Sequence, residues 1–290
     1  MPAEPAADLD ADLDAGLDAG LDAGLDADLD TGAADLARAV GFQHAFARRR
    51  APREVAVPGG FAVIDGRYPG SHDDNKLIVG PGPVPETPEE AREAAERLLR
   101  AADEMLAERE HRLVCVDDDR LGTALAPAFL AAGYEHETNL IMAFRGATPP
   151  GSAPAGQLSL AELLPVLRRD WRHTLPQAPD EVIDRLALRV EGRLRGADAV
   201  SFWGVRAPDG EIAARADLYE HGGVAQIESV FTGADHRGKG HARALMTALL
   251  AKAAEAELIF LVADAADWPK DFYAKLGFET LGRTHAFLRT

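Results

Sequence analysis

The sequence is poor in cysteine and has no long apolar runs. Cys115 is the single cysteine among 290 residues, which excludes an intrachain disulfide framework. No apolar run reaches the roughly 18 residues that a membrane-spanning helix needs, and no basic segment followed by an apolar one marks a secretory signal. These absences predict a cytoplasmic protein that does not bind membranes.

Positive charge is absent from the start of the chain. Residues 1–35 hold ten Asp and Glu4 but no Lys or Arg, and the whole chain has a formal net charge of -17. The remainder is mildly acidic, which argues against a nucleic-acid partner, because phosphate contacts need a basic face. Leucine recurs at every fourth position from Leu9 to Leu29, interleaved with Asp and Gly, which are weak helix formers. We therefore predict a disordered acidic leader over residues 1–35.

Two α/β segments follow the leader, separated by a linker that is rich in Pro and Gly at residues 147–156. In residues 36–146 the pattern predicts strands at 60–64, 113–116 and 140–144, and helices at 87–108 and 122–132, the first capped by Thr87. In residues 157–290 it predicts helices at 160–171, 180–195, 240–254 and 270–276, strands at 200–206, 212–219, 224–231 and 258–262, and a last pair of strands.

A glycine-rich turn connects the strand at 224–231 to an apolar helix. Its residues are Arg237, Gly238, Lys239, Gly240, His241, Ala242 and Arg243. Backbone N–H groups at a helix N-terminus attract anions, and glycine lets a phosphate approach the main chain. The turn therefore predicts a phosphate site; the alternative is a plain turn beside solvated basic residues. No metal site is expected, because His236 and His241 lack further ligands at a suitable spacing.

A second motif places Tyr273 four residues before the pair Gly277 and Phe278. Together with the spacing of Arg237, Gly240 and Ala242, it resembles the GNAT superfamily of acyl-CoA-dependent N-acetyltransferases. The resemblance covers residues 158–289 and implies an α/β GNAT fold, with a central mixed, mostly antiparallel sheet flanked by helices. It also implies acetyl-CoA as cosubstrate, and a strand 224–231 that splays from strand 258–262. Main-chain groups of Val230, Phe231 and Thr232 would then hold the pantetheine arm in the cleft.

The resemblance assigns catalysis to Tyr273, which matches the usual general acid of the family and would protonate the departing thiolate. The alternative is an aromatic ring that only packs. Glu228 is the first candidate for the general base, because it lies two residues before Val230 and is therefore expected on the same face of the strand. Asp217 is the second candidate; either carboxylate could instead be a solvated residue or an ion-pair partner. A main-chain N–H near Val230 would stabilise the oxyanion.

The first half of the chain echoes the second. The segment from Phe129 to Glu135 is similar to that from Tyr273 to Glu279, with Phe129 in the place of Tyr273 and without its hydroxyl. No Arg-x-x-Gly-x-Gly/Ala turn occurs before Phe129. We therefore predict a tandem architecture, in which a smaller degenerate GNAT-like domain at 36–146 precedes the catalytic domain at 157–290. The polar segment 68–75 is its expected contribution to substrate binding, with a plain surface turn as the alternative.

The predicted activity is direct transfer of an acetyl group from acetyl-CoA to a primary amine of a small molecule or peptide. Cys115 lies in an apolar run without a neighbouring activating base, so a covalent relay through it is not expected. The alternative function is a non-catalytic CoA-binding or ligand-sensing module.

Overall fold

The computed structural model describes residues 14–150 and 154–290, and the side chains of the first helix from residue 31 onward. The strands in these ranges are β1 (Arg53–Val57), β2 (Gly60–Ile64), β3 (Asn75–Val79), β4 (Arg112–Val116), β5 (Glu135–Phe144), β6 (Ala155–Leu158), β7 (Ala199–Arg206), β8 (Ile212–His221), β9 (Val224–Thr232), β10 (Leu258–Asp264) and β11 (Phe278–Arg289). The helices are α1 (Asp14–Arg50), α2 (Pro88–Met105), α3 (Asp119–Ala131), α4 (Leu160–Thr174), α5 (Asp180–Leu188), α6 (Val190–Arg193), α7 (His241–Lys252) and α8 (Pro269–Ala274), with a 3-10 turn η1 (Ala234–His236).

All described strands join one sheet in the order β1-β2-β3-β4-β11-β5-β10-β9-β8-β7-β6. Neighbours are antiparallel except β3 with β4 and β9 with β10. The last strand of each half is exchanged, since β11 pairs with β4 of the first half and β5 pairs with β10 of the second. β5 and β11 also pair with each other along the middle of the sheet. The predicted mixed, mostly antiparallel sheet is confirmed, and its two halves are continuous.

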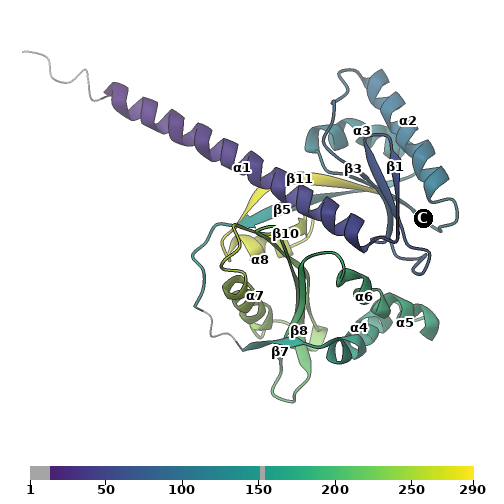
Figure 1. Ribbon diagram of the computed structural model, residues 1–290, viewed down its shortest axis with the longest axis vertical. Helices are drawn as coiled ribbons and strands as arrows, with labels where there is room; N and C mark the ends of the chain where they lie inside the picture. The colour runs from purple at the N-terminus through teal and green to yellow at the C-terminus, as the bar shows by residue number, and fades with distance from the viewer. Residues whose placement is uncertain (1–13, 151–153) are drawn as a thin grey trace, which may run out of the picture.

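Helices cover both faces of this sheet (Figure 1). On one face α1 crosses the middle of the sheet and packs Phe42 and Phe46 against buried residues of β5, β8 and β10. On the opposite face α2 and α3 form a cluster with β3 and β4, and α7 packs on β7 to β9. Neighbouring residues of β3 belong to different clusters, Leu77 to that of α2 and α3 and Ile78 to that of α1. The two faces of the sheet therefore have separate cores.

Local sequence explains several helix boundaries. Thr87 and Glu90 form a capping box at the start of α2, and Ser159 and Glu162 form another at the start of α4. Each box satisfies backbone N–H groups that a helix N-terminus otherwise leaves without a partner. The cap predicted at Thr87 is confirmed.

Residues 14–35 of the predicted disordered leader belong to helix α1. Residues 1–13 lie outside the described part of the chain. Tertiary contacts explain the difference where side chains are described: Asp35 is buried and pairs with Arg145 at 2.5 Å, and Leu36 packs over Gly282. Anchored contacts of this kind outweigh weak intrinsic helix propensity.

The end of the chain and the linker also differ from expectation. One strand, β11, replaces the predicted pair, with a register shift between Thr280 and Gly282. β1, β3 and β6 were not predicted, and β6 begins at Ala155, inside the predicted linker 147–156, of which residues 151–153 lie outside the described part. The domain boundaries at 146 and 157 stay a prediction.

Candidate active site

The glycine-rich turn adopts a backbone that only glycine accepts readily. Gly238 and Gly240 have φ values of +73° and +84°, and Gly240 is the N-cap of α7. A Cβ atom on either glycine would have no neighbour within 4 Å. Glycine is thus required by φ and not by packing, and the space over the turn is open to an approaching group.

The electrostatics of this turn suit an anion. The first turn of α7 contains no acidic residue, and no side chain caps its N–H groups. Within the described residues, Lys239 and Arg243 form no ion pair, and Arg237 donates to the carbonyl oxygen of Thr232 at 3.4 Å. Three basic residues and uncapped helix N–H groups therefore lie at one open turn, which is a suitable site for a pyrophosphate.

Strands β9 and β10 separate just before this turn. They pair only from Val224–Gln226 to Leu258–Phe260, although β9 continues to Thr232. The register between β8 and β9 shifts where Asp217 faces Glu228 but Arg215 faces Phe231, so β9 carries one extra residue. Ser229, at φ +56°, is the one non-glycine residue with positive φ in the described part of the chain. This bulge bends β9 just beyond the point where its pairing with β10 ends.

The bulge also corrects the predicted position of Glu228. Glu228 lines a cavity on the α1 face of the sheet, whereas Val230 packs against the cluster on the α7 face. The prediction that both residues share a face is therefore wrong, because the extra residue at Ser229 breaks the alternation of the strand. Glu228 accepts hydrogen bonds from Gln226 Nε2 at 2.8 Å and from the Ser229 backbone N–H at 3.0 Å. Burial raises the pKa of Glu228, although the nearby Arg193 guanidinium opposes the shift.

Asp217 is fully engaged in an ion pair. Its side chain is buried and accepts from Arg193 Nη1 at 2.5 Å and from the Tyr219 hydroxyl at 2.7 Å. Arg193 also donates to Ser229 Oγ at 3.1 Å, so it ties α6 to the bulge of β9. Because removal of one partner from such a buried pair is costly, Asp217 is better suited to holding Arg193 than to accepting a proton from a substrate. Arg193 was not singled out in the sequence, since its partners are distant along the chain.

Tyr273 lies on the other side of the opening. It is buried in the cluster between α7, α8 and β9, to which Val230 also contributes. Burial raises the pKa of Tyr273 to about 12, and the negative charge of Glu228 adds to this shift. Tyr273 and Glu228 therefore approach the same opening from opposite faces of the sheet, with Tyr273 protonated at neutral pH.

The corresponding positions of the first half have a different chemistry. Phe129 is fully buried and stacks on Phe287 with ring centroids 4.4 Å apart, and Gly133 has φ +81°, as Gly277 has φ +96°. Helix α2, which follows β3 as α7 follows β9, begins with a capping box and with Glu89 and Glu90. Its N-terminus is therefore already capped and negatively charged, which opposes phosphate binding.

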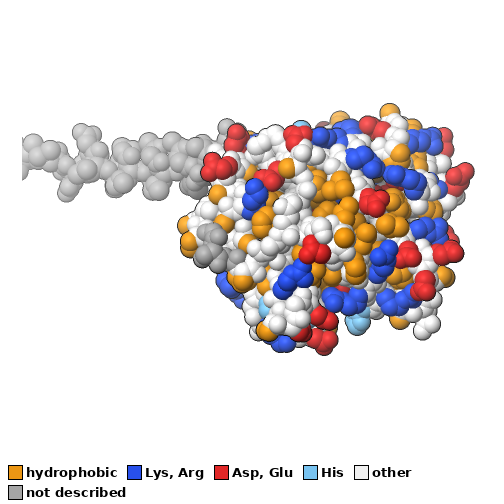
Figure 2. Space-filling view, turned by 60° about the horizontal axis from the view of Figure 1, so that its bottom comes forward, with side chains coloured by type: hydrophobic (Ala, Val, Ile, Leu, Met, Phe, Trp, Pro, Cys, Tyr) orange, Lys and Arg blue, Asp and Glu red, His pale blue; other side chains and the backbone are white. Residues whose placement is uncertain are grey.

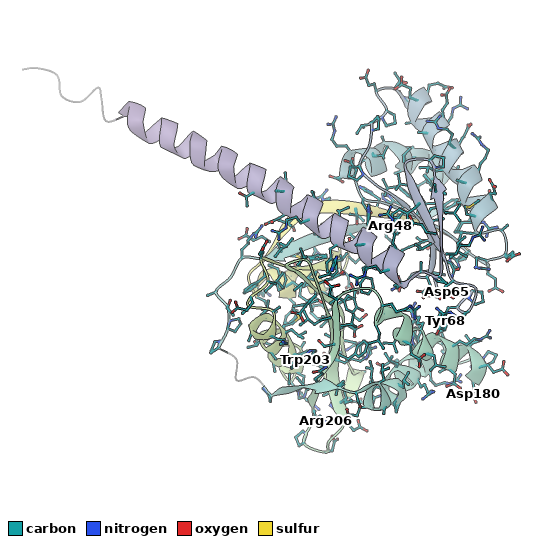
Figure 3. All side chains as sticks on the ribbon, in the orientation of Figure 1. Arg48, Asp65, Tyr68, Asp180, Trp203 and Arg206 are labelled. Atoms are coloured by element: carbon teal, nitrogen blue, oxygen red, sulfur yellow. The ribbon has the colours of Figure 1, made fainter. Side chains whose placement is uncertain are left out.

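A cavity of about 570 Å³ lies between the α1 face of the sheet and the helices above it. Residues from α1, from the segment before β3, from α6 and from seven strands line it, and Glu228 and Ser229 are among those of β9. A second hollow of about 310 Å³ reaches Val230 and Phe231 and shares Arg189, Arg193 and Ser229 with the first. His72 and Asp73 of the predicted polar segment line the larger cavity. Figure 3 shows Asp65 and Tyr68 where the first half approaches α5 and α6, and Tyr68 donates to the Leu188 carbonyl at 3.3 Å.

We did not predict the part of α1 that covers this cavity, although its residues show the spacing of a helix. Leu36, Val40, Gln43, Ala47 and Arg50 recur at helical spacing, and the last three line the cavity.

On the outside, Lys and Arg side chains are interspersed with Asp and Glu over the face shown in Figure 2. Within the described residues, no helix combines the length and the apolar composition needed to cross a membrane.

Comparison with known proteins agrees with this geometry. Residues 160–278 match the acetyltransferase (GNAT) family. A conserved protein of unknown function from Staphylococcus epidermidis superposes with a TM-score of 0.59 at 12% identity, over 82% of this chain and 93% of that one. A GCN5-related N-acetyltransferase from Kribbella flavida gives a TM-score of 0.54 at 18% identity, over 82% and 89% of the two chains. A tandem GNAT protein from the clavulanic acid biosynthesis pathway, solved without AcCoA, gives 0.51 at 17% identity, over 79% and 78%. No curated protein matches the sequence.

At these identities the solved structures show a shared fold, and the family match covers the half that contains the glycine-rich turn and Tyr273. Residues 160–278 therefore form a domain of the acetyltransferase (GNAT) family, and the fold of the chain fits a tandem arrangement of two GNAT-like halves.

Proposed function

We propose that the protein transfers an acetyl group from acetyl-CoA directly to a primary amine. The observation that carries the proposal is the opening between β9 and β10, with the anion-binding turn after its end and Glu228 and Tyr273 on its two sides. The turn from Arg237 to Arg243 would bind the pyrophosphate of acetyl-CoA. Main-chain groups of Val230, Phe231 and Thr232 would hold the pantetheine arm, since β10 does not pair with this part of β9.

In the proposed step, Glu228 accepts one proton and Tyr273 donates another. The amine nitrogen attacks the thioester carbonyl, a C–N bond forms and the C–S bond breaks. Glu228, directly or through water, accepts the proton that the amine loses, and the Tyr273 hydroxyl protonates the departing thiolate. A backbone N–H near Val230 stabilises the oxyanion that forms between these events. The raised pKa of Glu228 makes its carboxylate a stronger base than an ordinary glutamate, and the raised pKa of Tyr273 keeps that acid protonated at neutral pH.

Cys115 is unsuited to a covalent relay. It lines the cavity on β4, in the first half, and burial raises the pKa of its thiol to about 11. The thiol is therefore protonated at neutral pH and a weak nucleophile. This supports direct transfer.

We infer further that the first half, residues 36–146, is a degenerate GNAT-like domain that no longer binds acetyl-CoA. Phe129 in the place of Tyr273, and the capped, acidic start of α2, support this inference. Its remaining contribution to function would be the walls of the acceptor cavity, through β3, β4 and the segment before β3.

Replacing Glu228 with glutamine should lower kcat by about a hundredfold and leave the Kd for acetyl-CoA unchanged, because a positioned base contributes about that much. In the wild type, activity should fall as pH drops through the pKa of Glu228, which burial places above that of an ordinary glutamate. The variant should lose this acid limb in its pH–rate profile of kcat/KM. Glu220→Gln, on the neighbouring strand β8, serves as the matched control. An unchanged rate and acid limb in Glu228→Gln would remove Glu228 from the mechanism.

A further inference from the structure

The bulge at Ser229 sets the direction of two groups of the proposed mechanism. Glu228, the proposed base, precedes Ser229, and the proposed oxyanion donor near Val230 follows it. Glu228 accepts a hydrogen bond from the Ser229 backbone N–H at 3.0 Å, and the side chains of Glu228 and Val230 lie on opposite faces of the sheet. The backbone conformation of Ser229 therefore determines where both groups point.

The neighbouring strands give Ser229 little support. The register between β8 and β9 shifts at this point, so Ser229 has no partner in the ladder with β8. Strand β10 pairs with β9 only up to Gln226. Ser229 also lines the hollow of about 310 Å³. A positive φ is unfavourable for a residue with a side chain, so the value of +56° at Ser229 requires other contacts that hold it.

Two arginines supply these contacts. Arg193 of α6 donates from Nη1 to Ser229 Oγ at 3.1 Å, and Arg215 of β8 donates from Nη1 to the Ser229 carbonyl oxygen at 3.4 Å. Since the Ser229 N–H is donated to Glu228, every polar group of Ser229 has a partner. The two guanidinium groups come from different elements, and one binds the side chain of Ser229 while the other binds its main chain.

A carboxylate holds each arginine in place. Asp217, whose side chain is 2% exposed, accepts from Arg193 at 2.5 Å. Asp170 of α4 accepts from Arg215 at 3.0 Å, and these two side chains are 10% and 12% exposed. A buried ion pair often gives no more stability than apolar residues of the same volume. Two such pairs beside one residue with positive φ therefore fit a positioning role better than a stabilising one.

We propose that Arg193 and Arg215 are positioning residues, which hold Ser229 in its left-handed conformation. This conformation directs Glu228 and the N–H group near Val230 into the opening between β9 and β10. The inference rests on the proposed acetyltransferase function, because both directed groups have their roles in that reaction. Neither arginine exchanges a proton during acetyl transfer, and each acts through Ser229.

The competing explanation is that the two ion pairs only join α4 and α6 to β8. It predicts a change in stability without a change in the chemical step. The pKa of Glu228 separates the two explanations. Burial raises this pKa and Arg193 of α6 opposes the shift, while Asp73 before β3 and Asp217 of β8 add smaller increases. Because Glu228 must be deprotonated to act, loss of Arg193 should move the acid limb of activity to higher pH.

The test replaces each ion pair as a whole, so that no charge stays buried without its partner. The interior variants are Arg215→Met with Asp170→Leu, and Arg193→Met with Asp217→Asn. The control is Arg168→Met with Asp184→Asn, which removes an exposed ion pair of 2.6 Å between α4 and α5. Each protein is measured by urea unfolding, by calorimetric titration with acetyl-CoA and by release of CoA. The amines are lysine, cadaverine, phenethylamine and spermidine, of which the one that the wild type acetylates fastest is used.

Both interior variants should lower kcat by about tenfold to a hundredfold, because a displacement of about 1 Å at reacting groups can cost this much. Their urea midpoints and Kd for acetyl-CoA should change little, since the glycine-rich turn is unaltered. The variant without Arg193 should also show the acid limb of kcat/KM at higher pH. Ser229→Ala, which keeps both ion pairs, should lower kcat several-fold, because Arg193 then no longer binds residue 229. The control should match the wild type.

Crystal structures of the wild type and of the interior variants supply a measurement that does not require turnover. Ser229 should keep its positive φ in the wild type and lose it in the variants. An unchanged kcat, or an unchanged φ at Ser229, in both folded interior variants would overturn the inference. Failure of the proposed function gives a different result, in which the wild type binds no acetyl-CoA or releases no CoA with any of these amines. The φ of Ser229 then decides whether the two arginines hold it.

Discussion

Replacing Tyr273 with phenylalanine is expected to lower kcat by about a hundredfold or more, because the departing thiolate then loses its proton donor. The ring packs in the cluster between α7, α8 and β9, and phenylalanine keeps that packing. Binding of acetyl-CoA should be unaffected, since the substitution removes one hydroxyl and leaves the glycine-rich turn and its basic residues unchanged. Single-turnover measurements of CoA release, beside the Kd for acetyl-CoA, separate the chemical step from binding.

The matched control is Tyr134→Phe in the first half. Tyr134 packs edge-on against Phe129, as Tyr273 neighbours Phe278, and its buried hydroxyl has no hydrogen-bond partner among the described residues. Loss of this hydroxyl should leave kcat unchanged. Equal kcat values for Tyr273→Phe and the wild type would reduce Tyr273 to a packing residue.

Replacing Phe287 with alanine is expected to lower the free energy of unfolding by about 3–5 kcal/mol. Phe287 belongs to β11 near the end of the chain, but it is fully buried in the first-half cluster of α2, α3, β3 and β4. Its ring stacks on Phe129 at 4.4 Å and on His136 at 4.7 Å. Because β11 and β5 are exchanged between the halves, damage to the first-half cluster should destabilise the whole sheet.

The tryptophans make this prediction directly measurable. Trp171, Trp203 and Trp268 all lie in the second half, so their fluorescence reports the unfolding of that half in urea. If the two halves unfold as one cooperative unit, Phe287→Ala should lower the urea midpoint of the tryptophan fluorescence transition. The midpoint of the circular dichroism transition should fall with it. Leu130→Ala on α3, where the side chain is 53% exposed, should shift it little. An unchanged tryptophan midpoint in Phe287→Ala would show that the two halves unfold independently.

Short-range patterns in the sequence predicted the elements and motifs that depend on neighbouring residues. The capping box at Thr87, strands β7 to β10 and the turn before α7 all follow from residues close together in the chain. The echo between Phe129 and Tyr273 is likewise a local pattern, and the matching glycine conformations at Gly133 and Gly277 agree with it.

Features that depend on distant residues were not predicted. The exchange of β5 and β11 is set by pairing across more than a hundred residues, and each strand pattern fits either half equally well. The folding of residues 31–35 depends on Arg145, and the bulge at Ser229 depends on the ladder with β8. For the same reason the sequence analysis placed Glu228 on the wrong face and did not single out Arg193.

Calorimetric titration of acetyl-CoA into the full chain tests the central claim most directly. Gly240→Asp should weaken binding by about a hundredfold or more, since a carboxylate at the N-terminus of α7 repels the pyrophosphate. Gly210→Asp controls for backbone strain, because Gly210 also has a positive φ, +90°, with no atom within 4 Å of a Cβ. Saturable binding by the wild type and Gly210→Asp, lost in Gly240→Asp, is the predicted result. No binding by the folded wild type, or equal binding by Gly240→Asp, would contradict the acetyl-CoA site.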